Sequence, residues 1–377
     1  MDLHAKYPGL YDLKRRAQKR LPKFVWEYLD SATGVEATKA RNRAKLDKIL
    51  LKTSILLGDF TPDLSTKIGQ ETFPLPFGIA PVGMSGLIWP DAERILAQSA
   101  ARSGVPYCLS TVAAQTPEYI TPYLGGPSWF QLYPPKDPDI RQDMLNRAKA
   151  AGFDTLVLTV DIPVPSRRER QTRSGLTQPP KLTPRLMAQV AMRPAWALAT
   201  AREGMPRMRT LDKYISPDQA HLPPTAHIGY LLRASPDWDY LRWLREHWKG
   251  QLIVKGVTLP EDATKREAEG IDVIWISNHA GPVDSRMAAV LLVQSAIRAA
   301  TSLPIIFDSG IEGGLDILRA IALGANFVML GRAFHYAVAA LGEIGPDHLT
   351  DMLKKDIQAN MGQIGTKSLK ELASCLI

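Results

Sequence analysis

Residues 304–332, PIIFDSGIEGGLDILRAIALGANFVMLGR, contain one complete strand–helix–strand unit. The apolar run Pro304–Phe307 is followed by a glycine-rich turn, a helical pattern over Leu315–Ala322 and a second apolar run, Phe327–Leu330. Continuously apolar strands that alternate with helices are typical of a buried parallel sheet. Glycines after such strands also let backbone amides approach a phosphate. The stretch therefore predicts a parallel α/β fold with an anion site at the ends of these two strands.

The same alternation extends backwards along the chain. Six further short apolar runs precede this unit, at Phe77–Ala80, Tyr107–Ser110, Trp129–Tyr133, Thr155–Val160, Leu252–Val254 and Val273–Ser277. Helical patterns lie between them, including Asp91–Ser103, Asp139–Ala151, Asp239–His247 and Asp262–Glu269. Eight strand–helix units favour a closed (β/α)8 TIM barrel. A doubly wound open sheet is the alternative, but it needs a glycine-rich dinucleotide turn after its first strand, and Ala80–Met84 is not one.

Two segments fall outside this repeat. We expect residues 1–70 to form helices that precede the barrel, and residues 166–237 to form an insertion after the fourth strand. The chain is then a single domain over residues 1–377, with the barrel at 71–165 and 238–345 and C-terminal helices at 346–377.

The insertion has two interpretations. Long loops in barrels often serve as lids or subunit contacts. Its stretch Leu186–Arg209, however, is rich in Arg and carries Trp196, and a basic segment with an aromatic side chain can also lie on a membrane surface.

Composition excludes several classes of protein. Apolar residues at 45% and charged residues at 22% are ordinary globular values, so disorder and collagen are excluded. Two cysteines cannot build a disulfide framework or a multi-thiolate metal site, and this favours the cytoplasm. No window is apolar enough to span a bilayer. The net charge of +8 is scattered along the chain, so nucleic acid is not an expected partner.

Polar side chains follow the predicted strands. The carboxyl ends carry Pro81, Val82, Gly83, Ser110, Gln131, Tyr133, Thr159, Asp161, Lys255, His279, Asp308, Gly310, Gly331 and Arg332. Active sites of (β/α)8 barrels lie at this face. An amide, hydroxyls, a lysine, a histidine and an aspartate that converge there predict a site for a polar planar cofactor with acid–base chemistry.

Three of these residue types suggest roles. Lys255 is either a surface lysine at a strand boundary or a fixed positive charge beside the N1–C2 carbonyl edge of a reduced flavin. His279 directly follows a strand, where a general base is expected, and Asp161 could hold its imidazolium form by pairing with it. The other histidines have no metal-ligand spacing, so no metal is expected.

At this point the motifs are recognisable. Gln131–Tyr133, Leu158–Asp161, Lys255–Val257, Asn278–His279 and Asp308–Gly310, in this order and followed by Gly331–Arg332, resemble the FMN-dependent 2-hydroxy acid dehydrogenase/oxidase family. That family includes glycolate oxidase, L-lactate dehydrogenase and mandelate dehydrogenase. The similarity runs from Tyr28 to the final helices, and the insertion most resembles bacterial members in which this region can mediate membrane association.

The resemblance implies a role for each site residue. FMN would contact the backbone of Pro81, Val82 and Gly83, the side chains of Ser110, Gln131, Thr159 and Lys255, and the phosphate loop that contains Asp308, Gly310, Gly331 and Arg332. Tyr28 and Tyr133 would face the substrate, Arg168 would bind its carboxylate, and His279 would be the base with Asp161 as its partner. Oxygen, a quinone or a cytochrome would accept the electrons. A homotetramer is implied, cytoplasmic or peripheral at the inner membrane face.

Three positions depart from the family pattern. Pro282 stands where relatives have a second substrate-binding arginine, Glu312-Gly313 stand where two basic residues usually follow the phosphate loop, and Val112 replaces a frequent aromatic. Loss of a charge-assisted contact in a closed site costs on the order of 2–4 kcal/mol of transition-state stabilisation. Three hypotheses remain: a flavin enzyme with an atypical, bulkier or uncharged hydroxy substrate, an ordinary lactate- or mandelate-type enzyme in which Arg286 replaces the lost arginine, and a non-catalytic flavin-binding barrel.

Overall fold

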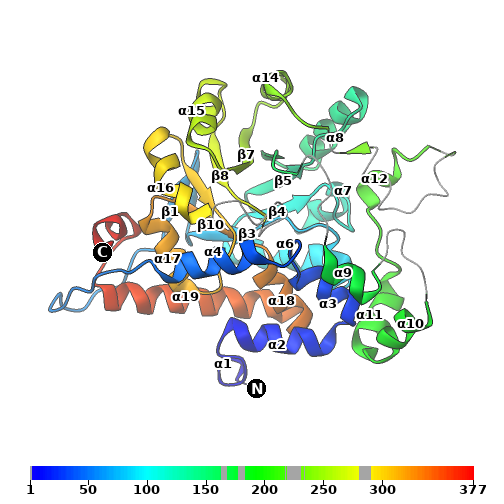
Figure 1. The fold of residues 1–377 in the computed structure, drawn as a ribbon, viewed down its shortest axis with the longest axis horizontal. Coiled ribbons are helices and arrows are strands. Elements are labelled where there is room, and N and C mark those ends of the chain that lie inside the picture. Colours follow the sequence, from blue (N-terminus) through cyan, green and yellow to red (C-terminus); the bar gives the residue numbers. More distant parts are fainter. Residues whose placement is uncertain are drawn as a thin grey trace.

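The computed structural model describes residues 2–162, 168–176, 183–216, 218, 231–232, 234–279 and 290–377, with only the backbone at 290–293. Within these ranges eight parallel strands close into a barrel in the order β10-β3-β4-β5-β6-β7-β8-β9, which confirms the predicted TIM barrel (Figure 1). The strands are β3 Phe77–Ile79, β4 Tyr107–Ser110, β5 Ser128–Leu132, β6 Thr155–Thr159, β7 Gln251–Val257, β8 Val273–Ile276, β9 Ile305–Phe307 and β10 Phe327–Leu330.

Seven of the barrel strands agree with the sequence prediction to within one residue at each end. The exception is β7, which we expected to end at Val254 but which continues to Val257. Its register against β8 shifts between Lys255 and Val257, as in a β-bulge. Bulges re-aim side chains and are common beside active sites. The irregularity therefore determines where Lys255 and its neighbours point.

Helices cover the outside of the barrel (Figure 1). They are α5 Ser85–Ile88, α6 Ala92–Ser103, α7 Pro117–Ile120, α8 Pro138–Ala150, α14 Trp238–His247, α15 Pro260–Ala268, α16 Val290–Ala300, α17 Gly314–Ala322, α18 Arg332–Leu341 and α19 Gly345–Ile364, with short 3-10 turns at Thr121–Tyr123, Gly342–Ile344 and Leu369–Cys375. Their apolar faces are buried against the strands or, as for α19, against neighbouring helices. In α17 this face is formed by Ile317, Leu318 and Ile321.

The segment before the barrel differs in part from the expectation. Helices α1 Leu3–Lys6, α2 Leu10–Arg20, α3 Lys23–Asp30 and α4 Ala37–Asp47 are present, but the rest of residues 1–70 is not helical. Instead, β1 Thr66–Ile68 and β2 Glu71–Phe73 pair antiparallel, so the boundary expected at residue 70 divides a hairpin. Ile68 and Phe73 are fully buried with Trp129 and Phe327 in the amino-terminal end of the barrel. Burial of these apolar side chains stabilises the hairpin. The sequence did not predict it, because three-residue strands give almost no periodic signal.

The insertion forms a lobe of helices beside α3. It contains α9 Glu169–Ser174, α10 Pro184–Ala191, α11 Pro194–Glu203 and α12 Arg209–Asp212. The basic stretch 186–209 is therefore two helices and a turn, because Pro194 starts a new helix after Arg193. Figure 1 shows α10 and α11 in green at the edge of the molecule, near the end of α3. In the part of the chain that the structure describes, no helix combines the length and apolar character needed to cross a bilayer.

Candidate active site

A cavity of about 1670 Å³ opens at the carboxyl ends of the barrel strands. This exceeds the roughly 300–1,000 Å³ that ligand pockets usually occupy. Twelve sequence-predicted site residues line it, and they come from the N-terminal helices, the barrel loops and the insertion: Tyr28, Pro81, Val82, Gly83, Tyr133, Arg168, Lys255, His279, Asp308, Gly310, Gly331 and Arg332. Folding therefore brings together residues that are up to about three hundred positions apart in the sequence.

His279 and Asp161 form a close pair at one wall of the cavity. Nδ1 of His279 lies 2.6 Å from Oδ2 of Asp161, and only 19% of the His279 side chain is exposed. Burial alone would raise the pKa of Asp161, but the charge and hydrogen bond of His279, with Lys255 further away, lower it below its usual value. Because Nδ1 is engaged, Nε2 is the ring nitrogen that remains to act on a substrate.

The backbone around this pair is unusual in two places. His279 has a φ of 48°, which is rare for a residue other than glycine and is typical of strained functional positions. Gly256, in the bulge of β7, has a φ of 105°, and a Cβ there would lie 2.5 Å from Cγ of Asp161. Only glycine leaves room for the Asp161 carboxylate. The sequence analysis did not identify Gly256 as a site residue, although a glycine after a strand-end lysine is a signal for close approach.

Lys255 is a buried cation at the base of the cavity. Its Nζ donates a hydrogen bond to Oγ of Ser277 at 2.7 Å and lies 3.3 Å from Oδ2 of Asp308. Only 3% of Lys255 is exposed. The same Oγ of Ser277 accepts the backbone N–H of His279 at 3.2 Å, so Ser277 connects the cation to the backbone of the candidate base. Ser277 is a second residue that sequence reasoning missed.

Ser110, Gln131 and Thr159 lie beneath the cavity and not on its lining. Oγ of Ser110 donates to Oε1 of Gln131 at 2.9 Å, and Nε2 of Gln131 donates to Oγ1 of Thr159 at 2.9 Å. All three are buried. A row of mutually satisfied polar groups is a stable floor on which the polar edge of a planar ligand can lie.

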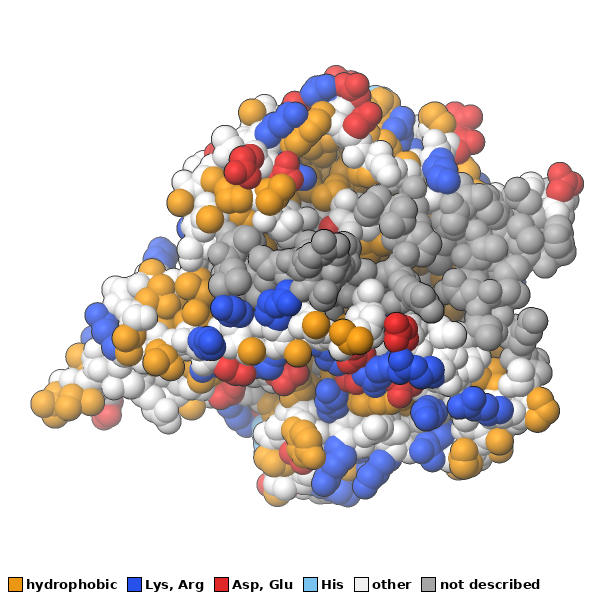
Figure 2. Space-filling view, in the orientation of Figure 1, with side chains coloured by type: hydrophobic (Ala, Val, Ile, Leu, Met, Phe, Trp, Pro, Cys, Tyr) orange, Lys and Arg blue, Asp and Glu red, His pale blue; other side chains and the backbone are white. Residues whose placement is uncertain are grey.

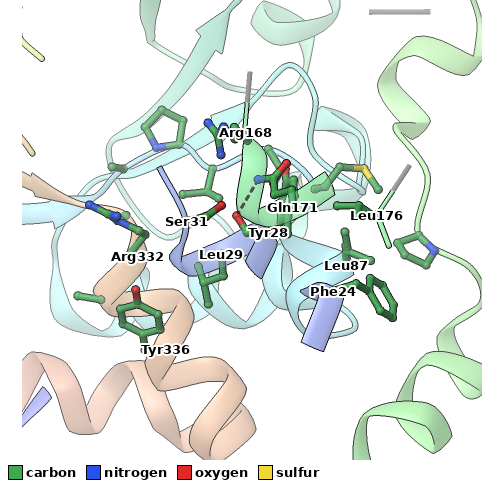
Figure 3. A pocket seen from close by; sticks show the side chains of 18 of the residues that line it. Phe24, Tyr28, Leu29, Ser31, Leu87, Arg168, Gln171, Leu176, Arg332 and Tyr336 are labelled. Atoms are coloured by element: carbon green, nitrogen blue, oxygen red, sulfur yellow. Dashed lines mark hydrogen bonds between the residues drawn. The ribbon is translucent and has the colours of Figure 1, made fainter. Parts of the chain in front are cut away.

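The insertion reaches the cavity through α9. Arg168 precedes this helix and lines the cavity, and Nε2 of Gln171 donates to the carbonyl of Tyr28 at 3.4 Å (Figure 3). Arg170 of α9 pairs with Glu27 at 2.6 Å and Glu36 at 3.0 Å. These contacts fix α9 to the N-terminal helices, so Arg168 and Tyr28 hold a defined relative position.

Tyr28 connects the N-terminal helix α3 to the loop after β3. Its hydroxyl donates to the carbonyl oxygen of Gly83 at 2.9 Å. Burial raises the pKa of Tyr28, an effect that the nearby Arg168 guanidinium opposes. The phenol therefore remains protonated and able to donate a hydrogen bond in the cavity.

Another part of the cavity is formed by the predicted phosphate loop. Ser309 and Gly310 have φ values of 83° and 108°, and Arg332 begins α18 directly after Gly331. A helix N-terminus with a flanking arginine favours an anion. Glu312 also lines this end, but its side chain is exposed.

His335 connects the loop after β10 to the loop after β3. Its Nδ1 lies 2.8 Å from the carbonyl oxygen of Gly331, and its Nε2 lies 2.7 Å from Oγ of Ser85. That hydroxyl is 3.0 Å from the carbonyl oxygen of Val82. Burial lowers the pKa of His335 to about 4, so the ring is neutral near pH 7. His335 lies inside α18, where the local sequence carries no signal of a site residue.

The donor set fits FMN. A flavin needs a cation near its N1–C2 edge and an anion site for its phosphate, and Lys255 and Arg332 line one cavity with the buried Ser110–Gln131–Thr159 row beneath it. The pocket is also large enough to hold a flavin and a substrate together.

Comparison with known proteins agrees with this geometry. Residues 17–377 match the family model described as FMN-dependent dehydrogenase. The chain belongs to the FMN-dependent dehydrogenase family. It is 38% identical over 368 residues to L-lactate dehydrogenase of Pseudomonas paraeruginosa, and 37% identical over 372 residues to that of Acinetobacter baumannii, with at least 96% of each chain covered. FMN as the cofactor and a 2-hydroxy acid type of oxidoreductase are thereby confirmed.

Solved structures of this family share the fold. The monotopic membrane protein (S)-mandelate dehydrogenase superposes with a TM-score of 0.93 at 33% identity, covering 98% of both chains. A soluble mutant of the membrane-associated (S)-mandelate dehydrogenase from Pseudomonas putida gives 0.82 at 33% identity, covering 98% of this chain and 99% of that one. Pro282 and Arg286, the two positions on which the choice among substrates depended, lie outside the described residues.

Proposed function

We propose that this family member oxidises a 2-hydroxy acid to the 2-keto acid, with His279 as the base. The observation that carries the proposal is the 2.6 Å contact between His279 and Asp161 in a cavity that also contains Lys255. A histidine oriented by a carboxylate is the usual form of a general base. The same cavity supplies a fixed cation for the negative charge that a reduced flavin acquires.

Each side chain has a definite task in this reaction. His279 takes one proton from the 2-hydroxy acid, and Asp161 stabilises the imidazolium that results. Bound FMN supplies the acceptor for the two electrons and the second hydrogen. Arg168 binds the substrate carboxylate, and the hydroxyls of Tyr28 and Tyr133, which line the same cavity, face the substrate. Oxygen, a quinone or a cytochrome would be the final electron acceptor.

The substrate that we propose is bulkier than lactate. One end of the cavity is apolar, and Figure 3 shows Phe24, Leu87 and Leu176 on the side of Tyr28 away from Arg332. Further apolar side chains continue this wall: Leu186, Met187, Val190, Trp196 and Met205. Val112, small for its position, lines the same cavity. The methyl group of lactate would leave this wall uncovered. A 2-hydroxy acid with an aromatic or branched aliphatic substituent would bury apolar area against the wall.

The test is anaerobic flavin reduction by a panel of hydroxy compounds. Bleaching that is faster with aromatic or long aliphatic 2-hydroxy acids than with lactate or glycolate supports the proposal. Faster bleaching by lactate contradicts the bulky substrate, and bleaching only by esters or alcohols contradicts the hydroxy acid. If no compound reduces the bound flavin, the protein is the non-catalytic alternative. Replacement His279→Gln should abolish the reduction while FMN remains bound, and an unchanged rate would exclude His279 as the base.

We also propose peripheral membrane attachment through α10 and α11. Met192 between these helices and Leu198 on α11 are more than half exposed, and Arg185, Arg193 and Arg202 lie near them in the sequence. Figure 2 shows Lys and Arg side chains beside apolar ones over the corner that α9–α11 occupy in Figure 1. Basic and apolar side chains together suit an anionic lipid surface. The structural similarity to a monotopic (S)-mandelate dehydrogenase supports this attachment.

A further inference from the structure

The phosphate end of the cavity has an unusual charge balance. Members of the family usually carry two basic residues directly after the phosphate loop, where this chain has Glu312-Gly313. An exposed carboxylate at the cavity edge repels a phosphate dianion. Among the described residues that directly follow β9 and β10, Arg332 is the cation that lines the cavity. A further cation near this end of the cavity would offset the negative charge of Glu312 and help to bind the phosphate.

Helix α4 crosses the phosphate loop and brings basic side chains to it. Cβ of Asn42 lies 3.5 Å from the position that a Cβ on Gly310 would occupy, and Nη1 of Arg43 donates to the carbonyl oxygen of Gly310 at 3.1 Å. Lys39 is one helical turn earlier, so it lies on the same side of α4 as these two residues. Figure 2 shows Lys and Arg side chains along α4.

The two α4 cations differ in what they can do. Arg43 forms a bidentate pair with Asp316, a buried carboxylate, and also binds Asp47, so its charge is neutralised away from the cavity. Lys39, by contrast, lines the cavity together with Gly310, Glu312 and Arg332. Its side chain is 24% exposed, so an ammonium group at this position can reach a ligand while it stays partly shielded from water.

Lys39 is held in place by Asp30 without being neutralised by it. Nζ donates to the backbone carbonyl of Asp30 at 2.6 Å and lies 3.6 Å from its carboxylate. That carboxylate also binds Lys14 at 3.0 Å, Arg170 at 3.1 Å and the Tyr336 hydroxyl at 2.8 Å. Three cations thus share this carboxylate. Nζ of Lys39 also lies 3.9 Å from Oε2 of Glu36, a carboxylate that Arg170 binds more closely at 3.0 Å. Burial lowers the pKa of Lys39, and the positive charge of Arg332 lowers it further. The carboxylates of Asp30 and Glu36 oppose this shift. Lys39 and Arg332 are therefore close enough to repel each other, and both line the same cavity.

We propose that Lys39 binds the phosphate of FMN together with Arg332, in compensation for the basic residue that Glu312 replaces. The inference rests on FMN as the cofactor and is independent of the substrate proposed above. A lysine suits this role because it acts as a point charge with three donors and needs no fixed plane of approach. A phosphate between Lys39 and Arg332 also removes the repulsion between these two cations.

Affinity of the apoprotein for two flavins tests the assignment. FMN and riboflavin differ only in the phosphate, so quenching of flavin fluorescence on titration with apoprotein isolates the phosphate contact. The variant Lys39→Met keeps the length of the side chain, and Lys45→Met makes the same charge change on the same helix away from the cavity. A charge-assisted contact contributes roughly 1.5–3 kcal/mol, so Lys39→Met should raise the Kd for FMN about ten- to hundredfold and leave that for riboflavin within about twofold.

The controls give each outcome a meaning. Lys39→Arg should keep most of the affinity for FMN, and Lys45→Met should keep all of it. If Lys39→Met weakens the binding of FMN and riboflavin equally, the lysine has a structural role and the proposal is overturned. The proposal is also overturned if Lys39→Met and Lys45→Met bind FMN with the same affinity. If Lys39→Met does not fold, Lys39→Gln replaces it in the same comparison. Adding Glu312→Lys to the Lys39 variant should restore FMN binding, and failure to do so would contradict a phosphate between these two positions.

Discussion

Asp161 and His279 are 118 positions apart in the chain, yet Oδ2 of one lies 2.6 Å from Nδ1 of the other. They follow β6 and β8, which are not neighbours but flank β7. Gly256 in the bulge of β7 leaves the space through which the two side chains meet, because a Cβ there would overlap the Asp161 carboxylate. The candidate base is therefore built across three strands.

The pair itself can be tested with Asp161→Asn. An amide cannot stabilise an imidazolium, so we expect flavin reduction by the best hydroxy acid to slow by roughly 10²- to 10⁴-fold, the range of general acid–base catalysis. Stopped-flow absorbance of the bound flavin measures this rate. Binding of FMN should be unchanged, because Asp161 contacts His279 and an asparagine has the same size as the aspartate it replaces. A rate within threefold of the parent would contradict the role of Asp161.

Acidification should also act through this pair. The pKa of Asp161 is lower in the folded than in the unfolded chain, so its contribution to stability is present above the ordinary carboxyl pKa and is lost as the pH falls towards the folded value. The parent should accordingly lose more stability than Asp161→Asn between about pH 5 and pH 3. Urea unfolding at several pH values measures the difference, and parallel curves for the two proteins would contradict it.

A glycine pair tests the space that the bulge provides. Gly256→Ala places a Cβ at 2.5 Å from Asp161 Cγ with a φ of 105°, whereas Gly152→Ala has a φ of 83° and no atom within 4 Å. Both variants should lose about 1 kcal/mol from backbone strain. Only Gly256→Ala should also slow flavin reduction, because it displaces Asp161 from His279. Equal effects of the two variants on the rate would show that the position of Asp161 is not controlled by Gly256.

Glu71 at the amino-terminal end of the barrel makes stability depend on pH near neutrality. Burial and the nearby Asp154 carboxylate raise the pKa of Glu71 to about 7. A raised folded pKa means that the folded chain binds the proton more tightly, so this stabilisation is complete below the ordinary glutamate pKa and is lost as the pH rises through about 7.

Glu71→Gln removes the loss of stability that ionisation of the buried carboxyl causes. Thermal unfolding should show the variant more stable than the parent at pH 8, by about 1 kcal/mol once partial exposure is allowed for, and nearly equal to it at pH 5. Glu246→Gln changes an exposed carboxylate by the same atoms and is the control. A constant difference between Glu71→Gln and the parent at both pH values would refute the assignment.

Vesicle binding tests the proposed membrane face. The double variant Met192→Gln and Leu198→Gln removes two exposed apolar side chains that do not line the cavity, and co-sedimentation with anionic phospholipid vesicles should fall several-fold. Leu56→Gln is the matched control, since Leu56 is 97% exposed on a loop far along the chain from the insertion. Equal loss of binding by the control would locate the lipid contact elsewhere.

The sequence was most informative about the barrel. Strands such as Tyr107–Ser110 and Phe327–Leu330 are continuously apolar and separated by amphipathic helices, and this local pattern is enough to specify a parallel barrel. It was least informative about β1 and β2, whose three-residue strands form only because Ile68 and Phe73 close the bottom of the barrel.

The candidate site divides in the same way. Residue type and position at a strand end are properties of the sequence, and they identified His279, Asp161, Lys255 and Arg332 before any contact was known. Which groups touch depends on chain segments that are distant in sequence and adjacent only after folding. Neither Ser277, which accepts a hydrogen bond from Lys255, nor Lys39, which lines the same cavity as Arg332, has a signal in its own sequence neighbourhood. The chemistry was therefore determined by the sequence, whereas the bulge of β7 and the packing of α4 and α9 over the barrel decided its geometry, because side-chain contacts form only where tertiary packing brings separate segments together.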